Sequence, residues 1–211
     1  MRKLFCFTFL MIAIYQTPLV ADSALKKSQR SVKAINSLKL DFELEMYSSL
    51  RKRTRTRTGK GLFSKPSSFR WRFDDKYGRE TYFFNGSKLS HYKESENLVL
   101  NFLPNSGFSK ELIRIVEMIL DHNKLAKVYD VTQQTDYLTE LKPRGPQNTE
   151  IKKIAISLTA PNRRYVSSIA IHYQDSNIST YRFKNQSVPK KTPKKSFVFI
   201  NPGTVKEKTM K

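Results

Sequence analysis

Cysteine is almost absent from this sequence of 211 residues, and histidine is scarce. The single cysteine, Cys6, lies at the start of an apolar run, so the rest of the chain has no thiol for a disulfide or a nucleophile. The histidines, His91, His122 and His172, stand far apart and have no second ligand at zinc spacing. Phosphate-binding glycine loops and the G-x-S-x-G elbow are missing as well. We therefore expect a protein that is not an enzyme and that needs no metal or cofactor.

Acidic residues are also few, which leaves a large positive charge. The sequence has 39 lysines and arginines against 18 aspartates and glutamates, a formal net charge of +21. Such a charge attracts polyanions: anionic phospholipid, lipopolysaccharide, nucleic acid or an acidic partner surface. A generally basic set of proteins in the source organism would explain the same charge, because the basic residues are spread along the whole chain.

The first 24 residues have the pattern of a secretion signal. Arg2 and Lys3 give a positive start, and residues 4–14 form an apolar core that is too short to be retained as a membrane span. Small residues follow, so we expect cleavage at about residues 21–24. Residues 25–211 then form one exported domain, and export makes nucleic acid a poor candidate for the partner.

Most of the chain after residue 37 alternates as half-buried β-strands do. Residues 38–46 place an apolar side chain at every second position and charged or polar ones between. Residues 61–100 predict four short strands, in which Phe69 and Trp71 alternate with arginines and Asn85-Gly86 is typical of a tight hairpin turn. One face of this meander is rich in large rings and must meet a core, a lid or a ligand.

The second half of the chain predicts more strands and few helices. The strands are expected over residues 128–132, 137–141, 151–159, 165–173, 178–184 and 196–200. Amphipathic periodicity predicts helices over residues 25–37 and 109–120. Strands at this spacing indicate one antiparallel sheet that curls into a barrel or half-barrel.

A run of alternating arginines, RKRTRTRT, starts at residue 51. On a strand, period two would place Arg51, Arg53, Arg55 and Arg57 on one face, about 7 Å apart. This interpretation predicts an anion-binding stripe for lipid headgroups or an acidic partner. A solvated strand face, or a hairpin tip that resists aggregation, is the alternative.

Two patches contain more specific motifs. The motifs are Gly61-x-Phe63, Lys65-Pro66-x-x-Phe69-x-Trp71, Asn85-Gly86-x-x-Leu89, and Phe197-Val198-Phe199 followed by Asn201-Pro202-Gly203-Thr204-Val205. In this order they resemble the periplasmic outer-membrane lipoprotein carrier family (LolA). The resemblance implies a mainly β (α+β) fold: an unclosed antiparallel β-barrel, or half-barrel, with a helical lid and an apolar cavity.

The resemblance also implies which residues form the cavity. Acyl chains are expected to contact apolar side chains of the sheet and lid: Val32, Ile35, Phe42, Leu44, Phe63, Phe69, Trp71, Phe83, Leu89, Val116, Ile119 and Leu120. Family members commonly have an arginine that latches the lid where this chain has Lys65. Lysine keeps the charge but loses the planar fork. Ordinary core packing is the alternative for each apolar residue.

The partners implied by the resemblance are acylated lipoproteins as cargo, an inner-membrane lipoprotein-releasing transporter, and an outer-membrane receptor or membrane, with the chain itself a periplasmic monomer. Three alternatives stay open: a LolB-like receptor or insertion factor, an envelope-stress-sensing relative, and an unrelated anionic-lipid or lipopolysaccharide binder that uses the arginine stripe. The missing lipobox cysteine argues against the first, and the short chain against the second.

Overall fold

The computed structural model describes residues 35–103, 107–120, 125, 128–135, 137–145, 150–159 and 165–210. The predicted secretion signal, Val32 and most of the helix predicted over residues 25–37 lie outside the described residues. Where that helix was expected to end, the chain is not helical: Ile35 lies in an irregular segment and Ser37 already begins the first strand.

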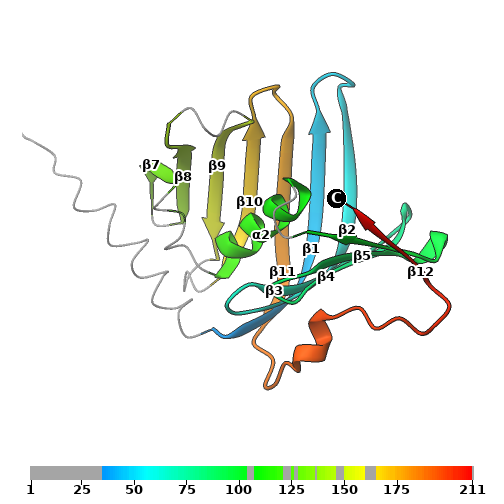
Figure 1. Ribbon diagram of the computed structural model, residues 1–211. Coiled ribbons are helices and arrows are strands. Elements are labelled where there is room, and N and C mark those ends of the chain that lie inside the picture. Colours follow the sequence, from blue (N-terminus) through cyan, green and yellow to red (C-terminus); the bar gives the residue numbers. More distant parts are fainter. Residues whose placement is uncertain are drawn as a thin grey trace, which may run out of the picture.

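One twelve-stranded sheet contains almost all of the described chain (Figure 1). Its strands are β1 Ser37–Ser48, β2 Arg53–Ser64, β3 Ser68–Asp75, β4 Gly78–Phe84, β5 Leu89–Lys93, β6 Leu98–Phe102, β7 Tyr129–Gln134, β8 Leu138–Pro143, β9 Ile151–Leu158, β10 Val166–Tyr173, β11 Ile178–Ser187 and β12 Lys206–Met210. Helix α2 spans Gly107–Leu120, and short 3₁₀ turns occupy Glu94–Glu96 and Lys194–Phe197.

The sheet is open, in the order β12-β6-β5-β4-β3-β2-β1-β11-β10-β9-β8-β7. Strand β1 joins its two halves, because it pairs with β2 on one side and with β11 on the other. All neighbours are antiparallel except β12, which pairs with β6 in parallel. Since β12 and β7 stand at opposite edges, the predicted mainly β fold with an unclosed barrel is confirmed.

The sheet curls around α2, which lies against one of its faces (Figure 1). We call this face the inner face. On β1 the even-numbered residues 38–44 are buried there, as the sequence alternation predicted. The predicted helix over residues 109–120 is also confirmed, and the apolar side chains that it buries are Leu112, Ile115, Val116, Met118, Ile119 and Leu120.

The strand predicted over residues 196–200 is wrong. This stretch follows Pro193 as a 3₁₀ turn and an irregular segment, and the last strand comes later, as β12. Phe197 is buried and Phe199 packs against Phe83 and Tyr92. The apolar alternation therefore reflects a loop anchored on the sheet, whereas β12 itself is a mostly exposed polar edge strand.

Candidate functional site

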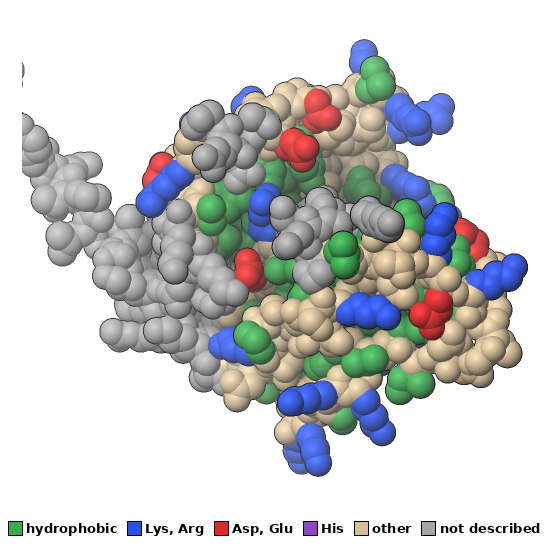
Figure 2. All heavy atoms as spheres, viewed as in Figure 1, with side chains coloured by type: hydrophobic (Ala, Val, Ile, Leu, Met, Phe, Trp, Pro, Cys, Tyr) green, Lys and Arg blue, Asp and Glu red, His purple; other side chains and the backbone are tan. Residues whose placement is uncertain are grey.

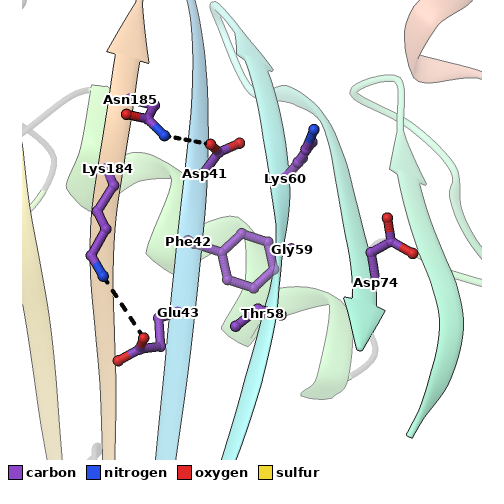
Figure 3. A pocket seen from close by; sticks show the side chains of 9 residues that line it. All are labelled: Asp41, Phe42, Glu43, Thr58, Gly59, Lys60, Asp74, Lys184 and Asn185. Carbon is purple, nitrogen blue, oxygen red and sulfur yellow. Dashed lines mark hydrogen bonds and ion pairs between the residues drawn. The ribbon is translucent and has the colours of Figure 1, made fainter. Parts of the chain in front are cut away.

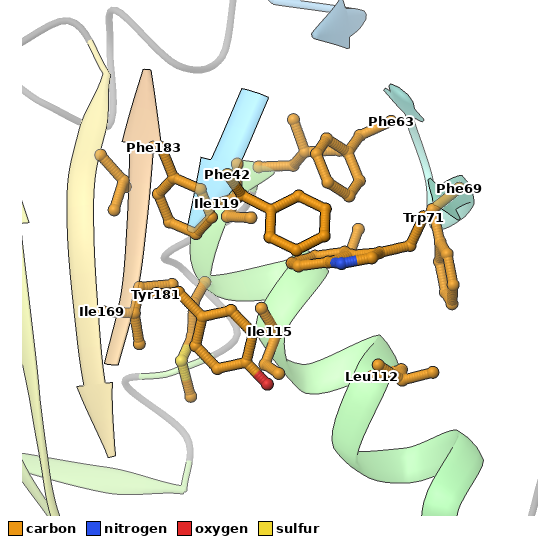
Figure 4. Packing of buried hydrophobic residues seen from close by; sticks show 14 of the residues in the cluster. Phe42, Phe63, Phe69, Trp71, Leu112, Ile115, Ile119, Ile169, Tyr181 and Phe183 are labelled. Atoms are coloured by element: carbon orange, nitrogen blue, oxygen red, sulfur yellow. The ribbon is translucent and has the colours of Figure 1, made fainter. Parts of the chain in front are cut away.

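The inner face of the sheet is lined with closely packed aromatic rings (Figure 4). Trp71 of β3 lies at the centre of this group of rings. The distance from its ring centroid is 4.6 Å to that of Phe42, 5.4 Å to that of Phe63 and 5.7 Å to that of Tyr181. The edge of Phe73 meets Phe42 at 5.1 Å. Rings from four strands, β1, β2, β3 and β11, thus form one apolar surface.

Helix α2 covers this surface with aliphatic side chains. Leu112, Ile115 and Ile119 point from α2 toward the rings in Figure 4 and belong to the same buried cluster. Packing of the helix on the sheet is therefore apolar, as the amphipathic sequence pattern predicted.

Two glycines of β2 have no side chain, and aromatic rings of the inner face fill the space beside them. A Cβ at Gly59 would overlap the carbonyl oxygen of Arg72 and would lie 2.6 Å from Cζ of Phe42. A Cβ at Gly61 would lie 2.6 Å from the ring of Phe63. Because no side chain stands on β2 at these two positions, rings from neighbouring positions cover that strand.

A polar atom lies within this apolar cluster. The indole nitrogen Nε1 of Trp71 is buried and has no hydrogen-bond partner among the residues that the structure describes. A buried donor without a partner is costly, on the order of 1–3 kcal/mol. A carbonyl or ester oxygen that enters the cluster would remove this cost.

The structure brings most of the predicted cavity residues into one cluster. Those buried together on the inner face or on α2 are Ile35, Phe42, Leu44, Phe63, Phe69, Trp71, Leu89, Val116, Ile119 and Leu120. Their contact with acyl chains stays a prediction, as does any role of Val32.

The placement of Phe83 in the cavity is wrong. Phe83 pairs with Arg70 across β3 and β4, on the outer face of the sheet, and packs against Phe199 with a centroid distance of 5.9 Å. Its neighbours Tyr82 and Phe84 are the residues of β4 that face inward, because they pair with Trp71 and Phe69.

Lys65 lies in the turn between β2 and β3, beside the cis Lys65–Pro66 peptide bond. Its backbone N–H donates to the carbonyl of Asn36 at 2.9 Å, which ties this turn to the start of β1. A latch between the Lys65 side chain and a lid stays a prediction.

The four alternating arginines do not form a uniform stripe. Arg51 lies in the turn between β1 and β2, while Arg53 and Arg55 are exposed on the strand. Arg57 is buried: its guanidinium lies 4.0 Å from the ring of Phe73 and forms an ion pair with Glu80 at 3.3 Å. The predicted stripe of four arginines on one strand face is therefore wrong, because Arg51 lies in the turn and Arg57 is buried beside Phe73 and Glu80.

Sequence reasoning missed the polar cluster around Glu80. This carboxylate accepts hydrogen bonds from Arg57 and from the hydroxyl of Tyr82 at 3.2 Å, and it lies 3.0 Å from Nε2 of His91. The rings of Tyr82 and His91 are stacked at 4.0 Å. The strand register between β3 and β4 could have revealed this cluster, since it places Glu80 opposite Phe73, at an inner-face position.

Burial decides the protonation of this cluster. Desolvation by burial, followed by the nearby charge of Glu80, raises the pKa of the Tyr82 hydroxyl well above its usual range. Desolvation also lowers the pKa of His91, although the hydrogen bond to Glu80 acts in the opposite direction. At neutral pH the two stacked rings, Tyr82 and His91, are therefore neutral.

A pocket of about 330 Å³ lies on the outer face, lined by residues of β1, β2, β3 and β11 (Figure 3). Its carboxylates already have partners: Asp41 accepts from Asn185 at 2.7 Å, and Glu43 pairs with Lys184 and Arg182. Within the described part of the chain, no three metal-ligating side chains come together, and no helix is both long and apolar enough to cross a bilayer.

The comparisons with known proteins agree with this architecture. A sequence model of the family described as outer membrane lipoprotein carrier protein LolA matches residues 33–200. A comparison with curated proteins found no match.

Solved structures resemble this chain at low sequence identity. An uncharacterized conserved protein from Thermus thermophilus matches with a TM-score of 0.56 and 7% identity over 90% of this chain and 99% of that chain. A LolA superfamily protein from Nitrosomonas europaea matches with a TM-score of 0.48 and 11% identity over 85% of this chain and 97% of that chain. The Mycobacterium tuberculosis lipoprotein LppX matches with a TM-score of 0.47 and 8% identity over 83% of this chain and 99% of that chain. The likeness to the Thermus thermophilus protein concerns the fold alone.

Proposed function

This chain belongs to the LolA family of outer membrane lipoprotein carrier proteins, and from this premise we propose that it is a periplasmic chaperone that binds the acyl chains of lipoproteins on its inner face. It would receive its cargo from an inner-membrane transporter, carry it as a monomer, and deliver it to an outer-membrane receptor. Binding and release of acyl chains involve no covalent step, so the proposed role is not enzymatic.

The observation that carries this proposal is the apolar inner face covered by one amphipathic helix. Each methylene removed from water contributes about 0.8 kcal/mol, so burial of ten methylenes contributes about 8 kcal/mol before the costs of association are subtracted. This gross gain equals the net free energy of micromolar binding, so the affinity for ten methylenes is weaker than micromolar once the costs are subtracted. Several acyl chains, or longer buried segments, supply the remainder.

The same packing favours release. Leu112, Ile115 and Ile119 contact the rings through apolar atoms, and an acyl chain offers the rings the same kind of contact. These three side chains have no polar atoms, so their exchange for acyl chains breaks no side-chain hydrogen bond of the helix. Such an exchange has a small net free energy, which suits a protein that must both accept and give up its cargo.

A release assay tests the proposal. Purified protein is added to spheroplasts, and the supernatant is examined for lipoproteins in complex with it. We expect soluble complexes with the wild type and about tenfold less with Leu112→Glu, which places a carboxylate at the boundary between α2 and the rings.

The matched control is Ile200→Glu, because Ile200 is 70% exposed and lies outside the buried cluster. This variant should release as much lipoprotein as the wild type. Circular dichroism checks that both variants are folded. Absence of lipoprotein from the wild-type supernatant, or equal release by both variants, would contradict a carrier that uses the inner face.

A further inference from the structure

The tip of the β1–β2 hairpin combines an exposed leucine with a cluster of cations. Leu50, at the apex, is 91% exposed, and Arg51, Lys52, Arg53 and Arg55 follow it in the turn and at the start of β2. We call these five residues the cationic tip. In Figure 2, blue side chains gather beside a green one at the top of the view, where Figure 1 shows the end of this hairpin.

Little negative charge opposes the cationic tip. The sequence contains no aspartate or glutamate between Glu45 and Asp74. The neighbouring β10–β11 turn has one carboxylate, Asp175, which accepts a hydrogen bond from Nδ2 of Asn177 at 2.6 Å. Among the described residues, none of the four cations of the tip forms an ion pair.

The tip is held in position by its neighbours. The backbone N–H of Ser49 donates to Oδ1 of Asn177 at 2.8 Å, and the Ser49 hydroxyl donates to the carbonyl of Asp175 at 2.6 Å. The guanidinium of Arg55 lies 3.9 Å from the ring of Tyr77 in the β3–β4 turn. Two adjacent turns thus fix the base of the tip, so Leu50 is presented to the outside without a large ordering cost.

The inner face of the sheet runs directly into the tip. Along β1 and β2, the inward pairs are Leu44 with Arg57, Met46 with Arg55, and Ser48 with Arg53. The surface therefore changes from apolar to cationic along one pair of strands. A bilayer has the matching order, with acyl chains beneath a layer of phosphates.

We propose that the cationic tip docks this protein on anionic phospholipid surfaces, with Leu50 inserted among the headgroups and the four cations bound to their phosphates. Arginine suits this role because its planar fork donates to two phosphate oxygens at once. Docking would bring the end of the inner face against the membrane. The inference rests on the proposed function only for the lipoprotein cargo that would be transferred at the membrane. The docking itself does not depend on it.

Binding to vesicles tests the docking. The full protein is sedimented with vesicles of phosphatidylethanolamine and phosphatidylglycerol, and with vesicles that contain no anionic lipid. Each cation near an anionic surface contributes roughly a fivefold gain in affinity. Replacing Arg51, Lys52, Arg53 and Arg55 with glutamine should therefore weaken binding by more than about 100-fold.

The matched control changes the same number of charges elsewhere. Lys190, Lys191, Lys194 and Lys195 are exposed in the loop after β11, and their replacement with glutamine removes an equal charge. The affinity of this variant for anionic vesicles should fall by at most about tenfold. Equal losses in the two variants, or equal binding to neutral and anionic vesicles, would overturn the proposal and leave general attraction or an acidic protein partner as the explanation.

Insertion of Leu50 has its own readout. In a Trp71→Phe background, Leu50→Trp is the only tryptophan, and its emission should shift to the blue when anionic vesicles are added. Leu50→Gln should weaken vesicle binding about tenfold, because a full leucine burial contributes that much or more. Emission that stays at the wavelength of the water-exposed indole while the protein is bound would overturn insertion.

Failure of this inference and failure of the proposed function can be told apart. Lipoprotein release from spheroplasts into solution measures cargo uptake, and the four-glutamine tip variant should retain it. If the tip binds vesicles but no lipoprotein is released by the wild type, the proposed function fails and the docking stands. If the wild type releases lipoprotein but the tip substitutions leave vesicle binding unchanged, only the docking proposal fails.

Discussion

The buried ion pair between Arg57 and Glu80 offers the sharpest test of how the inner face is built. Only 9% of the Arg57 side chain and 23% of the Glu80 side chain are exposed. The change Glu80→Gln removes the negative charge but keeps an oxygen that can accept from Tyr82. It therefore removes the carboxylate charge that pairs with the Arg57 cation at 3.3 Å and leaves that cation in place.

The expected loss of stability is large. Removing one partner of a buried pair costs about 3–5 kcal/mol, because the remaining charge is desolvated and unbalanced. Since Glu80 is partly exposed, we expect the lower end, about 3 kcal/mol. The double change Arg57→Met with Glu80→Gln leaves no unbalanced charge, so its stability should lie within about 1 kcal/mol of the wild type.

Urea unfolding followed by circular dichroism measures these differences. The control is Glu45→Gln, which breaks the pair of Glu45 with Arg182, whose side chains are 38% and 43% exposed. An exposed pair contributes less than about 1 kcal/mol. Equal losses for Glu80→Gln and Glu45→Gln, or a double variant as unstable as the sum of its single changes, would refute the reasoning.

Two further predictions concern other parts of the same face. Burial lowers the pKa of His91 and of His172, so the unfolded chain takes up more protons as pH falls through about 6.5, and the urea midpoint should drop between about pH 7 and pH 5. His91→Gln should make this drop smaller, while His172 maintains the rest of it; a drop equal to that of the wild type would argue against a role of His91. Gly59→Ala should lower the free energy of urea unfolding by about 1–3 kcal/mol, because its Cβ would overlap the Arg72 carbonyl. The control Lys60→Ala, at an exposed position of the same strand, should change it by less than about 0.5 kcal/mol. Similar values for the two would show that β2 tolerates a side chain at Gly59.

Alternation predicted those strands that have one apolar side. Residues 38–44 bury every second side chain, so period two alone identified β1 and its inner face. The motif around Trp71 likewise located β3 and the adjacent hairpin. In these strands the local sequence contains the information that decides the structure.

The errors arose where the decisive partner is distant in the sequence. Three consecutive aromatic residues end β4, and only the pairing of Tyr82 with Trp71 shows that Phe83 faces outward. The arginines of β2 have one repeating pattern, yet Arg57 alone is buried, because Phe73 and Glu80 come from later strands. β12 was missed since a polar edge strand has no alternation to detect.

The central claim is that acyl chains lie against the inner face, and the only tryptophan of the chain, Trp71, is buried there. The most direct measurement is the quenching of its fluorescence by a triacylated peptide with brominated acyl chains, since bromine quenches indoles that it contacts. A variant with Trp71→Phe and Phe83→Trp places the probe on the outer face of the same sheet. We predict strong quenching of Trp71 by the brominated chains, none by the unbrominated peptide, and none in the Phe83→Trp variant. Equal quenching on both faces, or binding of the peptide without quenching of Trp71, would contradict the account.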